Sequence, residues 1–181
     1  MSDIRERIIE IHGADILRKS AMNIRGGAGV FQQCLQNKGY RRALEIGTYR
    51  GVSSAEMAQY VERVITIDLK HGRLEQSGEN WQRYQFWDSL AVYNVELILV
   101  EDDAEKAAVV NGLDFDFAFI DGAHDKRVAD DFALVKRCGR VLFHDYDRRG
   151  VQGQDDVCDF VDSLPKEQIQ KMDIFALWTA P

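Results

Sequence analysis

Apolar and polar positions along this chain alternate in two spacings, which predict strands and helices in turn. Short apolar runs of strand length occupy Arg42 to Ile46, Val64 to Asp68, Val95 to Val100, Phe115 to Ile120 and Arg140 to Phe143. Apolar residues recur at helical spacing in Ser53 to Val61, Glu79 to Ala91, Ala104 to Val110, Arg127 to Lys136 and Asp155 to Ser163. Regular alternation of this kind predicts a doubly wound, mostly parallel α/β sheet with helices on both faces.

The N-terminal segment shows the spacing of an amphipathic helix. Asp3 and Glu6 are placed as a capping pair. Ile4, Ile8 and Ile11 then recur at helical spacing. We therefore expect a helix with one buried face, which lies across the sheet or its mouth.

The remaining segments complete a single domain. Segment 30–37 resumes helical spacing after the glycine-rich loop 25–29, and segment 171–179 alternates enough to form a final edge strand. A chain of 181 residues can bury one full sheet core. We expect one domain over 1–181, with a helical cap in 1–39 and the α/β core in 40–181.

The composition restricts the classes of function. The net charge of −7 and the pI of about 5.1 repel phosphate backbones, so no nucleic-acid partner is expected. No apolar run approaches the roughly 18 residues of a membrane span, and segment 1–20 mixes acids and bases with isoleucines, unlike a secretory signal. Cys34, Cys138 and Cys158 lack the spacing of a zinc or redox pair. We expect buried thiols, a cytoplasmic location and no membrane partner.

A glycine turn followed by a distant acid is the most informative pattern of the chain. The strand that ends at Ile46 runs into Gly47-Thr48-Tyr49-Arg50-Gly51, and the next apolar strand ends at Asp68. Glycine lets backbone N–H groups approach a ligand, because it has no Cβ atom. An acid about 20 residues later can accept hydrogen bonds from both ribose hydroxyls, since the two strand ends are neighbours in a parallel sheet. The pattern predicts a nucleoside-cofactor site.

The spacing of the glycines favours a cofactor without phosphates. Dinucleotide-binding folds prefer GxGxxG, which seats a pyrophosphate on a helix N-terminus. Gly47 and Gly51 are instead spaced as GxxxG, with three side chains between them. A nicotinamide-dependent oxidoreductase is therefore the alternative enzyme class rather than the leading hypothesis.

Residues 41–146 resemble class I S-adenosylmethionine-dependent methyltransferases. The run Glu45-Ile-Gly-Thr-Tyr-Arg-Gly-Val-Ser53 is similar to motif I of their small-molecule O-methyltransferases of the catechol and caffeoyl-CoA type. The resemblance implies a Rossmann-like seven-stranded sheet whose last two strands form an antiparallel hairpin. The segment after Leu164 is short, so a sheet of six strands is the alternative.

The resemblance also implies the residues that bind S-adenosylmethionine. Gly47 and Gly51 would line its methionine part, and Tyr49 and Ser53 would contact the amino and carboxylate groups. Near the adenine, Asp103 would meet the amino group; alternatively it caps the following helix. The full cofactor set is Glu45, Gly47, Tyr49, Gly51, Ser53, Asp68, Asp103, Ala104 and Asp121. Loop 22–29 is either a lid over the methionine end or a connector.

Two later strands end in ionisable residues. Asp121 and His124 follow the strand that ends at Ile120, and His144 and Asp145 follow the strand that ends at Phe143. Ligands of open α/β sheets bind outside the carboxyl ends of the strands. A buried strand that ends in an acid is costly unless the acid binds something. We therefore expect these side chains at the cofactor edge.

The resemblance implies a metal at this edge, with Asp121 and Asp145 as ligands of Mg²⁺ or Mn²⁺. The family has a basic lysine where this chain has His124, and its third metal ligand, an asparagine, is replaced by Tyr146. A histidine with an ordinary pKa near 6.5 suits a base at neutral pH, so His124 and Asp121 are the predicted catalytic residues. His144 either accepts the proton or orients its neighbours, and a metal-free acid/base site is the alternative.

These patterns together predict a methyltransferase that uses S-adenosylmethionine and methylates an oxygen of a small-molecule acceptor. The missing asparagine and the short C-terminus leave a noncatalytic cofactor-binding subunit as a further alternative. The aromatic residues Trp81, Tyr84, Phe86 and Trp87 fit the core or a subunit contact. Exposure of their outer members would favour a homodimer.

Overall fold

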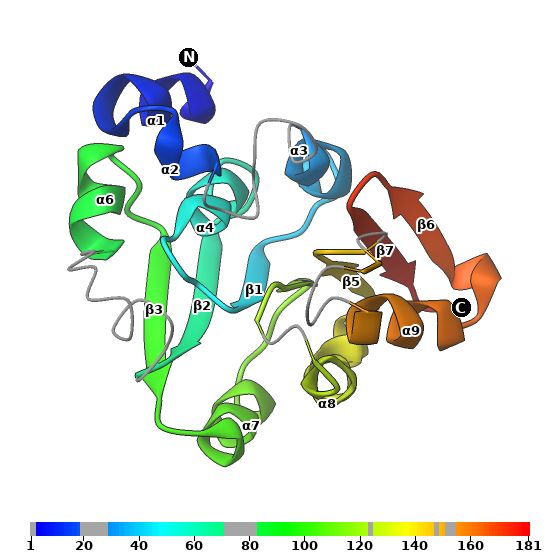
Figure 1. Cartoon of the computed structure of the whole chain (residues 1–181). Coiled ribbons are helices and arrows are strands. Elements are labelled where there is room, and N and C mark those ends of the chain that lie inside the picture. Colours follow the sequence, from blue (N-terminus) through cyan, green and yellow to red (C-terminus); the bar gives the residue numbers. More distant parts are fainter. Residues whose placement is uncertain (1–2, 19–28, 71–82, 123–124, 147–148, 151–154) are drawn as a thin grey trace.

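A seven-stranded mixed sheet forms the centre of the computed structural model (Figure 1). Its strands are β1 Arg42–Ile46, β2 Arg63–Leu69, β3 Val95–Val100, β4 Phe117–Ile120, β5 Arg140–Phe143, β6 Ile169–Met172 and β7 Phe175–Thr179. Their order is β3-β2-β1-β4-β5-β7-β6, with β7 antiparallel to both of its neighbours and the other pairs parallel. The predicted doubly wound α/β fold with seven strands is therefore confirmed.

Helices cover both faces of the sheet. The structure describes residues 3–18, 29–70, 83–122, 125–146, 149–150 and 155–181. Within these ranges the helices are α1 Ile4–His12, α2 Asp15–Arg18, α3 Val30–Leu35, α4 Val52–Met57, α6 Arg83–Ser89, α7 Asp103–Asn111, α8 Arg127–Val135 and α9 Asp155–Ser163, with short 3-10 turns at Lys136–Cys138 and Lys166–Gln168. No helix in the described part of the chain has the length and apolar character needed to cross a membrane.

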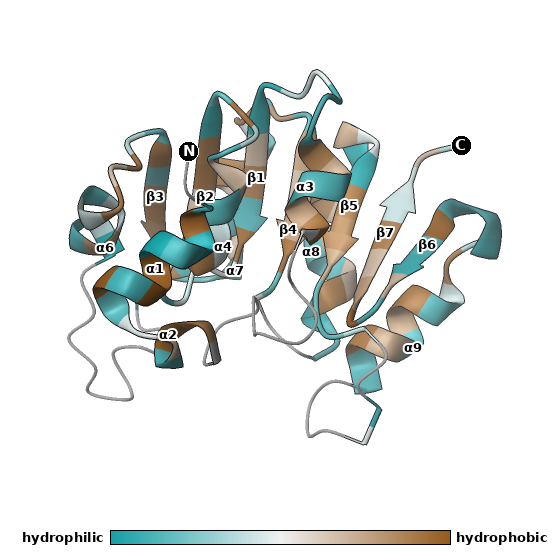
Figure 2. Ribbon diagram, turned by 90° about the horizontal axis from the view of Figure 1, so that it is seen from above, coloured by the Kyte–Doolittle hydropathy of each residue, from teal (hydrophilic) through white to brown (hydrophobic). Residues whose placement is uncertain are grey.

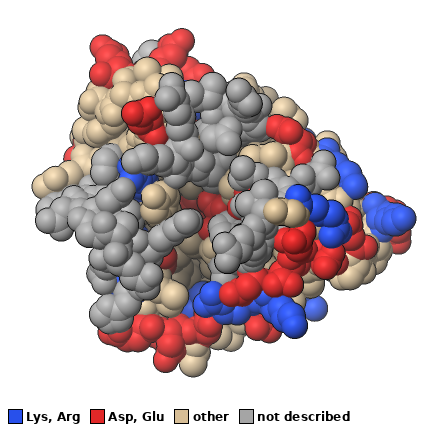
Figure 3. Space-filling model, viewed as in Figure 1, with Lys and Arg blue, Asp and Glu red and all other residues tan. Residues whose placement is uncertain are grey.

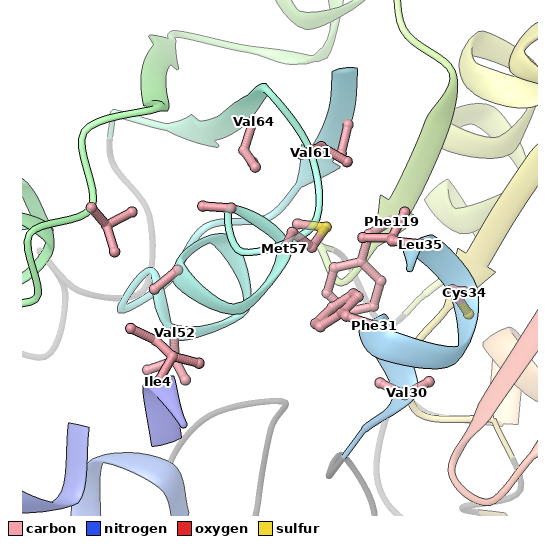
Figure 4. Close-up of a cluster of buried hydrophobic side chains, with 14 of the residues drawn as sticks. Ile4, Val30, Phe31, Cys34, Leu35, Val52, Met57, Val61, Val64 and Phe119 are labelled. Atoms are coloured by element: carbon pink, nitrogen blue, oxygen red, sulfur yellow. The ribbon is translucent and has the colours of Figure 1, made fainter. Parts of the chain in front are cut away.

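Successive strand residues point to opposite faces and form two separate hydrophobic cores. On one face Phe119 packs with α3 and α4, and the ring of Phe31 meets it edge to face at 5.1 Å (Figure 4). On the other face Phe143 packs with α8 and α9, and the ring of Phe132 lies 5.6 Å from it. In Figure 2 the helices carry both teal and brown segments, as amphipathic helices do, and β4 and β5 are tan or brown over most of their length. Both faces of the sheet are thus buried, as its near-continuous apolar strands predict.

The C-terminal corner holds two strands, which corrects the expectation of one edge strand over 171–179. The hairpin β6–β7 turns at Asp173, whose φ of 58° lies in the left-handed region. Because this turn is so tight, the short segment after Leu164 supplies both strands. β6 lies at the edge, and β7 is inserted between β5 and β6.

The N-terminal helix packs on the α4 and α6 side of the sheet (Figure 1). Asp3 caps α1 by accepting a hydrogen bond from the backbone N–H of Arg5. The guanidinium of Arg5 pairs with buried Glu56 on α4. Ile4 and Ile8 are buried as predicted, but Ile11 is 47% exposed. The expected buried face therefore does not extend to Ile11, and in the last turn it is His12 that contacts the domain, with its ring 4.9 Å from that of Phe86.

Other element boundaries shift by a few residues. α4 ends at Met57, whereas helical spacing predicted a helix to Val61. β4 begins at Phe117 rather than at Phe115. The predicted helix 79–91 is described only from Arg83 onward, where it forms α6. After Met57 the chain forms turns over 58–60 instead of a further helical turn, and the order of elements is unaffected.

Candidate functional site

The turn after β1 lies directly against the end of β4. Gly47 has φ +94°, and a Cβ atom on it would lie 2.4 Å from the carbonyl oxygen of Asp121. The backbone N–H of Asp121 in turn donates to the carbonyl oxygen of Ile46 at 2.9 Å. Only glycine accommodates both this backbone conformation and this close approach. The predicted cofactor turn is therefore fixed beside the residue that begins the loop after β4.

The second glycine of the motif lies against an indole ring. Gly51 has φ +78°, and a Cβ atom on it would lie 2.7 Å from Nε1 of Trp87. The same Nε1–H group donates to the carbonyl oxygen of Gly51 at 2.9 Å. Packing against α6 thus accounts for glycine at position 51. The proposed contact of Gly51 with the methionine part of a cofactor stays a prediction.

Asp68 stands at the end of β2 and is held by several donors. Its Oδ2 atom accepts from Nη2 of Arg83 at 2.6 Å and from the backbone N–H of Tyr49 at 3.2 Å. Its Oδ1 atom accepts from the backbone N–H of Leu69 at 3.0 Å. Burial raises the pKa of Asp68, and the charge of Arg83 offsets part of this effect. Asp68 is therefore connected to the glycine turn, and its role as the ribose acid stays a prediction.

Tyr49 is the non-glycine residue of the turn in the left-handed region, with φ 44°. Its carbonyl oxygen accepts from Nε of Arg83 at 2.6 Å, and the guanidinium of Arg50 lies 5.3 Å from the centre of its ring. Such conformations cost of order 1–3 kcal/mol and persist where surrounding bonds impose them. Here two hydrogen bonds hold Tyr49 in this conformation: its backbone N–H donates to Asp68, and its carbonyl oxygen accepts from Arg83.

Glu45 lies beneath the turn, inside the domain. Its carboxyl group is fully buried and accepts hydrogen bonds from the hydroxyl groups of Ser53, Ser54 and Thr66. Burial raises the pKa of Glu45 to about 7, against the lowering effect of the three hydroxyls. The hydroxyl of Thr48 lies 2.5 Å from that of Thr66 and extends the network to the turn itself. In this structure Glu45 and Ser53 support the turn from below, and their contact with the cofactor stays a prediction.

Three ionisable side chains meet where β4 and β5 end. The Nδ1 atom of His144 lies 2.7 Å from Oδ1 of Asp121 and 3.4 Å from Oδ1 of Asp145. His144 and Asp145 are buried, and the side chain of Asp121 is 13% exposed. The rings of Phe119 and Phe175 flank the imidazole at centroid distances of 6.5 and 5.1 Å. The structure thus brings together Asp121 and Asp145, with His144 between them.

The donor atoms of this cluster fit a divalent cation. One potential ligand atom each from Asp121, His144 and Asp145 lies within 4.8 Å of the other two. Ligand atoms about 2.1 Å from a common ion lie about 3 Å apart when their bonds form a right angle. The measured separations of 2.7 and 3.4 Å fall on either side of that value. The carboxylates of Asp121 and Asp145, whose ligand atoms lie within 4.8 Å of each other, also repel each other, and a bound cation would offset that repulsion.

Tyr146, which stands at the position of the family's asparagine, points away from this cluster. Its hydroxyl donates to Asp162 on α9 at 2.8 Å, and its ring lies 4.9 Å from Nζ of Lys171. Arg149 pairs with Asp159 and with Asp162 at 2.6 and 2.7 Å. Tyr146 and Arg149 therefore fasten the loop after β5 to α9.

The residues predicted near the adenine lie at the start of α7. Asp103 is the first residue of α7 and is exposed, and Ala104 is exposed beside it. The helix cap is Asp102, whose side chain accepts from the backbone N–H of Glu105, so the alternative of a cap at Asp103 is wrong by one residue. Asp103 instead accepts a hydrogen bond from Lys106 at 2.7 Å.

Several predicted features lie outside the described residues. They are His124, Trp81 and most of the proposed lid at 22–29. Within α6, Phe86 and Trp87 are buried, whereas Tyr84 is 57% exposed. The hypothesis of a homodimer through these aromatic residues stays a prediction. In Figure 3 acidic atoms are visible near the middle of the face, with basic groups toward its lower and right-hand rim.

Two sets of residues that build this site were not predicted from the sequence. Arg83 has no local signal, because it lies far from the motif in sequence and reaches Asp68 only through the fold. Thr66 and Ser54, which bind Glu45, look like ordinary strand and helix residues. Glu45 lies opposite Thr66 in the parallel register of β1 and β2. Without that register, the short polar side chains that face the buried glutamate cannot be identified.

Comparisons with known proteins agree with this fold. A family model described as "Methyltransferase domain" matches residues 44–146. A Bacillus cereus O-methyltransferase in complex with S-adenosylhomocysteine superposes with a TM-score of 0.66 at 16% identity, covering 100% of this chain and 91% of that one. The S-adenosylhomocysteine-bound Podospora anserina methyltransferase gives 0.64 at 16% identity, with coverage of 100% and 88%. A Streptococcus thermophilus rRNA methylase gives 0.56 at 16% identity, with coverage of 83% and 92%. No curated protein matches the chain. At these identities the superpositions establish the fold alone.

Proposed function

Because the chain belongs to the methyltransferase-domain family of class I S-adenosylmethionine-dependent enzymes, we propose that it methylates an oxygen atom of a small-molecule acceptor. The family fixes the donor chemistry, and the fold is shared by enzymes with different acceptors. The proposal therefore depends on the chemistry of the site rather than on the fold. The acidic net charge of −7 is one reason to prefer a small molecule to a nucleic acid.

One observation carries the proposal. The backbone of Gly47 is in contact with the backbone of Asp121, whose carboxylate faces His144. The methionine end of the cofactor would thus lie next to a cluster able to bind and deprotonate an acceptor. Methyl transfer from a sulfonium is an in-line displacement that needs close approach of donor and nucleophile. The short separation between the two parts of the site supports this arrangement.

The cofactor would lie at the carboxyl ends of β1, β2 and β4. In this proposal Gly47, Gly51, Tyr49 and Ser53 serve the methionine end, with Glu45 holding Ser53 in position. Asp68 accepts hydrogen bonds from the ribose. Asp103 and Ala104 lie at the adenine end, and Asp121 borders the site on the acceptor side.

In the reaction, the acceptor oxygen bonds to the methyl carbon while the sulphur–methyl bond breaks, which releases neutral S-adenosylhomocysteine. The acceptor hydroxyl must lose its proton for this step. We assign the proton to His124, which follows Asp121 by three residues in the sequence. A Mg²⁺ or Mn²⁺ ion held by Asp121 and Asp145 would supply positive charge that lowers the pKa of the acceptor hydroxyl.

The test combines binding with turnover. Purified protein is titrated with S-adenosylhomocysteine and, in parallel, with NAD; it is then incubated with methyl-labelled S-adenosylmethionine and a small-molecule extract, and products are identified by mass spectrometry. We expect S-adenosylhomocysteine to bind, NAD not to bind, and a labelled methyl ether or ester to appear.

Two variants and a chelator locate the activity. Asp121→Ala and His124→Ala should abolish turnover, whereas Asp114→Asn, at an exposed residue paired with Arg42, should not change it. EDTA should remove activity if a metal takes part. Tight cofactor binding without labelled product would instead support a noncatalytic cofactor-binding subunit, and a labelled amine or RNA would refute the small-molecule oxygen acceptor.

A further inference from the structure

We infer that His144 completes the metal site as a nitrogen ligand, so that the site selects a transition-metal ion such as Mn²⁺, Co²⁺ or Zn²⁺ over Mg²⁺. This inference rests on the proposed function, because it specifies the metal of the same site. It departs from an all-oxygen ligand set, in which two aspartates are joined by an asparagine.

The side chain at the position of that asparagine is not available as a ligand. The Tyr146 ring is buried, and its hydroxyl donates to Asp162 on α9. The ring also lies against the ammonium group of Lys171. These contacts hold Tyr146 against the outer layer of the fold. Among the described residues, a third protein ligand would therefore come from a side chain other than Tyr146.

His144 has the required position. Its Nδ1 atom, rather than the opposite edge of the ring, faces the Oδ1 atoms of both Asp121 and Asp145. Its backbone N–H donates to the carbonyl oxygen of Ile120 at 3.1 Å, which joins the ends of β5 and β4. The three donor atoms thus converge on one point from two adjacent strand ends.

The local backbone and packing hold this geometry. Asp145 adopts φ 58°, a left-handed conformation that lets two consecutive side chains approach Asp121. Phe119 and Phe175 flank the imidazole ring. A ligand whose orientation is fixed before binding loses little entropy when the ion arrives.

The donor set determines which ions are preferred. Carboxylate and water ligands suit Mg²⁺, whereas imidazole favours later divalent metals, whose affinity for nitrogen rises along the Irving–Williams series. One imidazole and two carboxylates therefore favour Mn²⁺, and more strongly Co²⁺ or Zn²⁺, over Mg²⁺.

Metal binding is measured directly, without turnover. MnCl₂ is added to the full chain, and electron spin-echo modulation detects nitrogen bound to the ion; a second sample carries ¹⁵N-labelled histidine. We expect nitrogen modulation in the wild type, which changes to the ¹⁵N pattern in the labelled sample. His144→Asn should lose the modulation, and His12→Asn, which alters a histidine on α1 packed against Phe86, should keep it.

Affinities give a second measurement. In His144→Asn the affinity for Co²⁺ should fall by about tenfold or more, while the weaker affinity for Mg²⁺ should change little. Binding of S-adenosylhomocysteine and the thermal transition check that the variant is folded. If it is not, the chain has three other histidines, and persistence of the modulation in His12→Asn, His71→Asn and His124→Asn would assign the nitrogen to His144 by elimination.

The outcomes separate this inference from the proposed function. Three results would overturn the inference, even if methyl transfer is observed. They are the absence of nitrogen modulation in the wild type, the persistence of that modulation in His144→Asn, and equal affinity of the wild type for Mg²⁺ and Co²⁺. Nitrogen coordination by His144 in a protein that transfers no methyl group to an oxygen would support the inference and refute the proposed function.

Discussion

Arg83 and Asp68 form an ion pair at the ribose end of the proposed site, with 2.6 Å between Nη2 and Oδ2. Both side chains are largely buried, at 13% and 18% exposure. Arg83 also donates from Nε to the carbonyl oxygen of Tyr49. One side chain from α6 thus connects the glycine turn after β1 with the acid at the end of β2. The distance between the two halves of the proposed cofactor site depends on this connection.

Replacing Arg83 with Met should weaken cofactor binding. The variant loses both hydrogen bonds and leaves the buried Asp68 without its cationic partner, so the turn at Tyr49 is held less firmly. We expect the Kd for S-adenosylhomocysteine, measured by calorimetry, to rise about tenfold, which corresponds to about 1.4 kcal/mol. Arg63→Met, at an exposed pair with Glu96, is the control and should leave the Kd unchanged. Tighter binding in Arg83→Met would show that Arg83 competes with the ribose for Asp68.

Replacing Gly47 with Ala should destabilise the fold more than the same change at Gly39. Both glycines have positive φ, but a Cβ atom at position 39 meets nothing within 4 Å, whereas at position 47 it meets the backbone of Asp121 and Gly122. Strain alone costs about 1–2 kcal/mol, and overpacking against rigid backbone adds about 1–3 kcal/mol. Urea unfolding of the two variants isolates the second contribution. Equal losses of stability would mean that the contact with β4 relaxes freely.

Replacing Lys106 with Met should destabilise the fold, because it leaves the buried Asp131 without its cationic partner. Asp131 is fully buried, and Lys106 bridges it to Asp103 at 2.6 and 2.7 Å. Burial raises the pKa of Asp131, and Lys106 opposes that rise. Removing one partner of a buried pair costs about 3–5 kcal/mol. We expect such a loss in thermal and urea unfolding of Lys106→Met, and partial recovery in the double variant with Asp131→Asn.

The stability of the double variant distinguishes two causes of the loss in Lys106→Met. If the double variant is no more stable than Lys106→Met, the loss comes from the missing lysine chain and not from the uncompensated charge of Asp131. The single variant Asp131→Asn completes the cycle and gives the interaction energy of the pair.

The sequence predicted the parts of this molecule that repeat with a fixed period. Alternating strands and helices indicated the sheet, and the interval from Gly47 to Asp68 indicated that their strand ends are neighbours, as β1 and β2 are. The GxxxG spacing also favoured a cofactor without phosphates, in agreement with the family match. These features depend on local periodicity and on short-range steric rules.

The missing parts depend on tertiary contacts. Arg83 reaches Asp68 because α6 packs beside the turn, which no spacing in the sequence reveals. His144 meets Asp121 because β4 and β5 are paired, and the sequence left its role open. The choice between one and two C-terminal strands stayed open in the sequence because one left-handed residue, Asp173, makes the hairpin shorter than the usual turn signals suggest.

Replacing Glu45 with Gln should change how stability depends on pH. Burial raises the pKa of Glu45 from 4.5 to about 7, so between these values the folded chain keeps a proton that the unfolded chain has lost. The free energy of unfolding therefore falls as pH rises through this interval and is constant above it. A pKa difference of this size between the folded and unfolded chain corresponds to about 3 kcal/mol in the free energy of unfolding. Glutamine is neutral at every pH and removes the contribution.

The measurement compares urea unfolding of wild type and Glu45→Gln from pH 4.5 to pH 8. We expect the wild type to lose stability relative to the variant as pH rises, with most of the change complete near pH 7. Glu62→Gln is the matched control: hydrogen bonding from Arg41 lowers the pKa of Glu62, so its much smaller effect on stability has the opposite sign. Parallel curves for wild type and Glu45→Gln would mean that the hydroxyl groups of Ser53, Ser54 and Thr66 stabilise the carboxylate well enough to cancel the effect of burial.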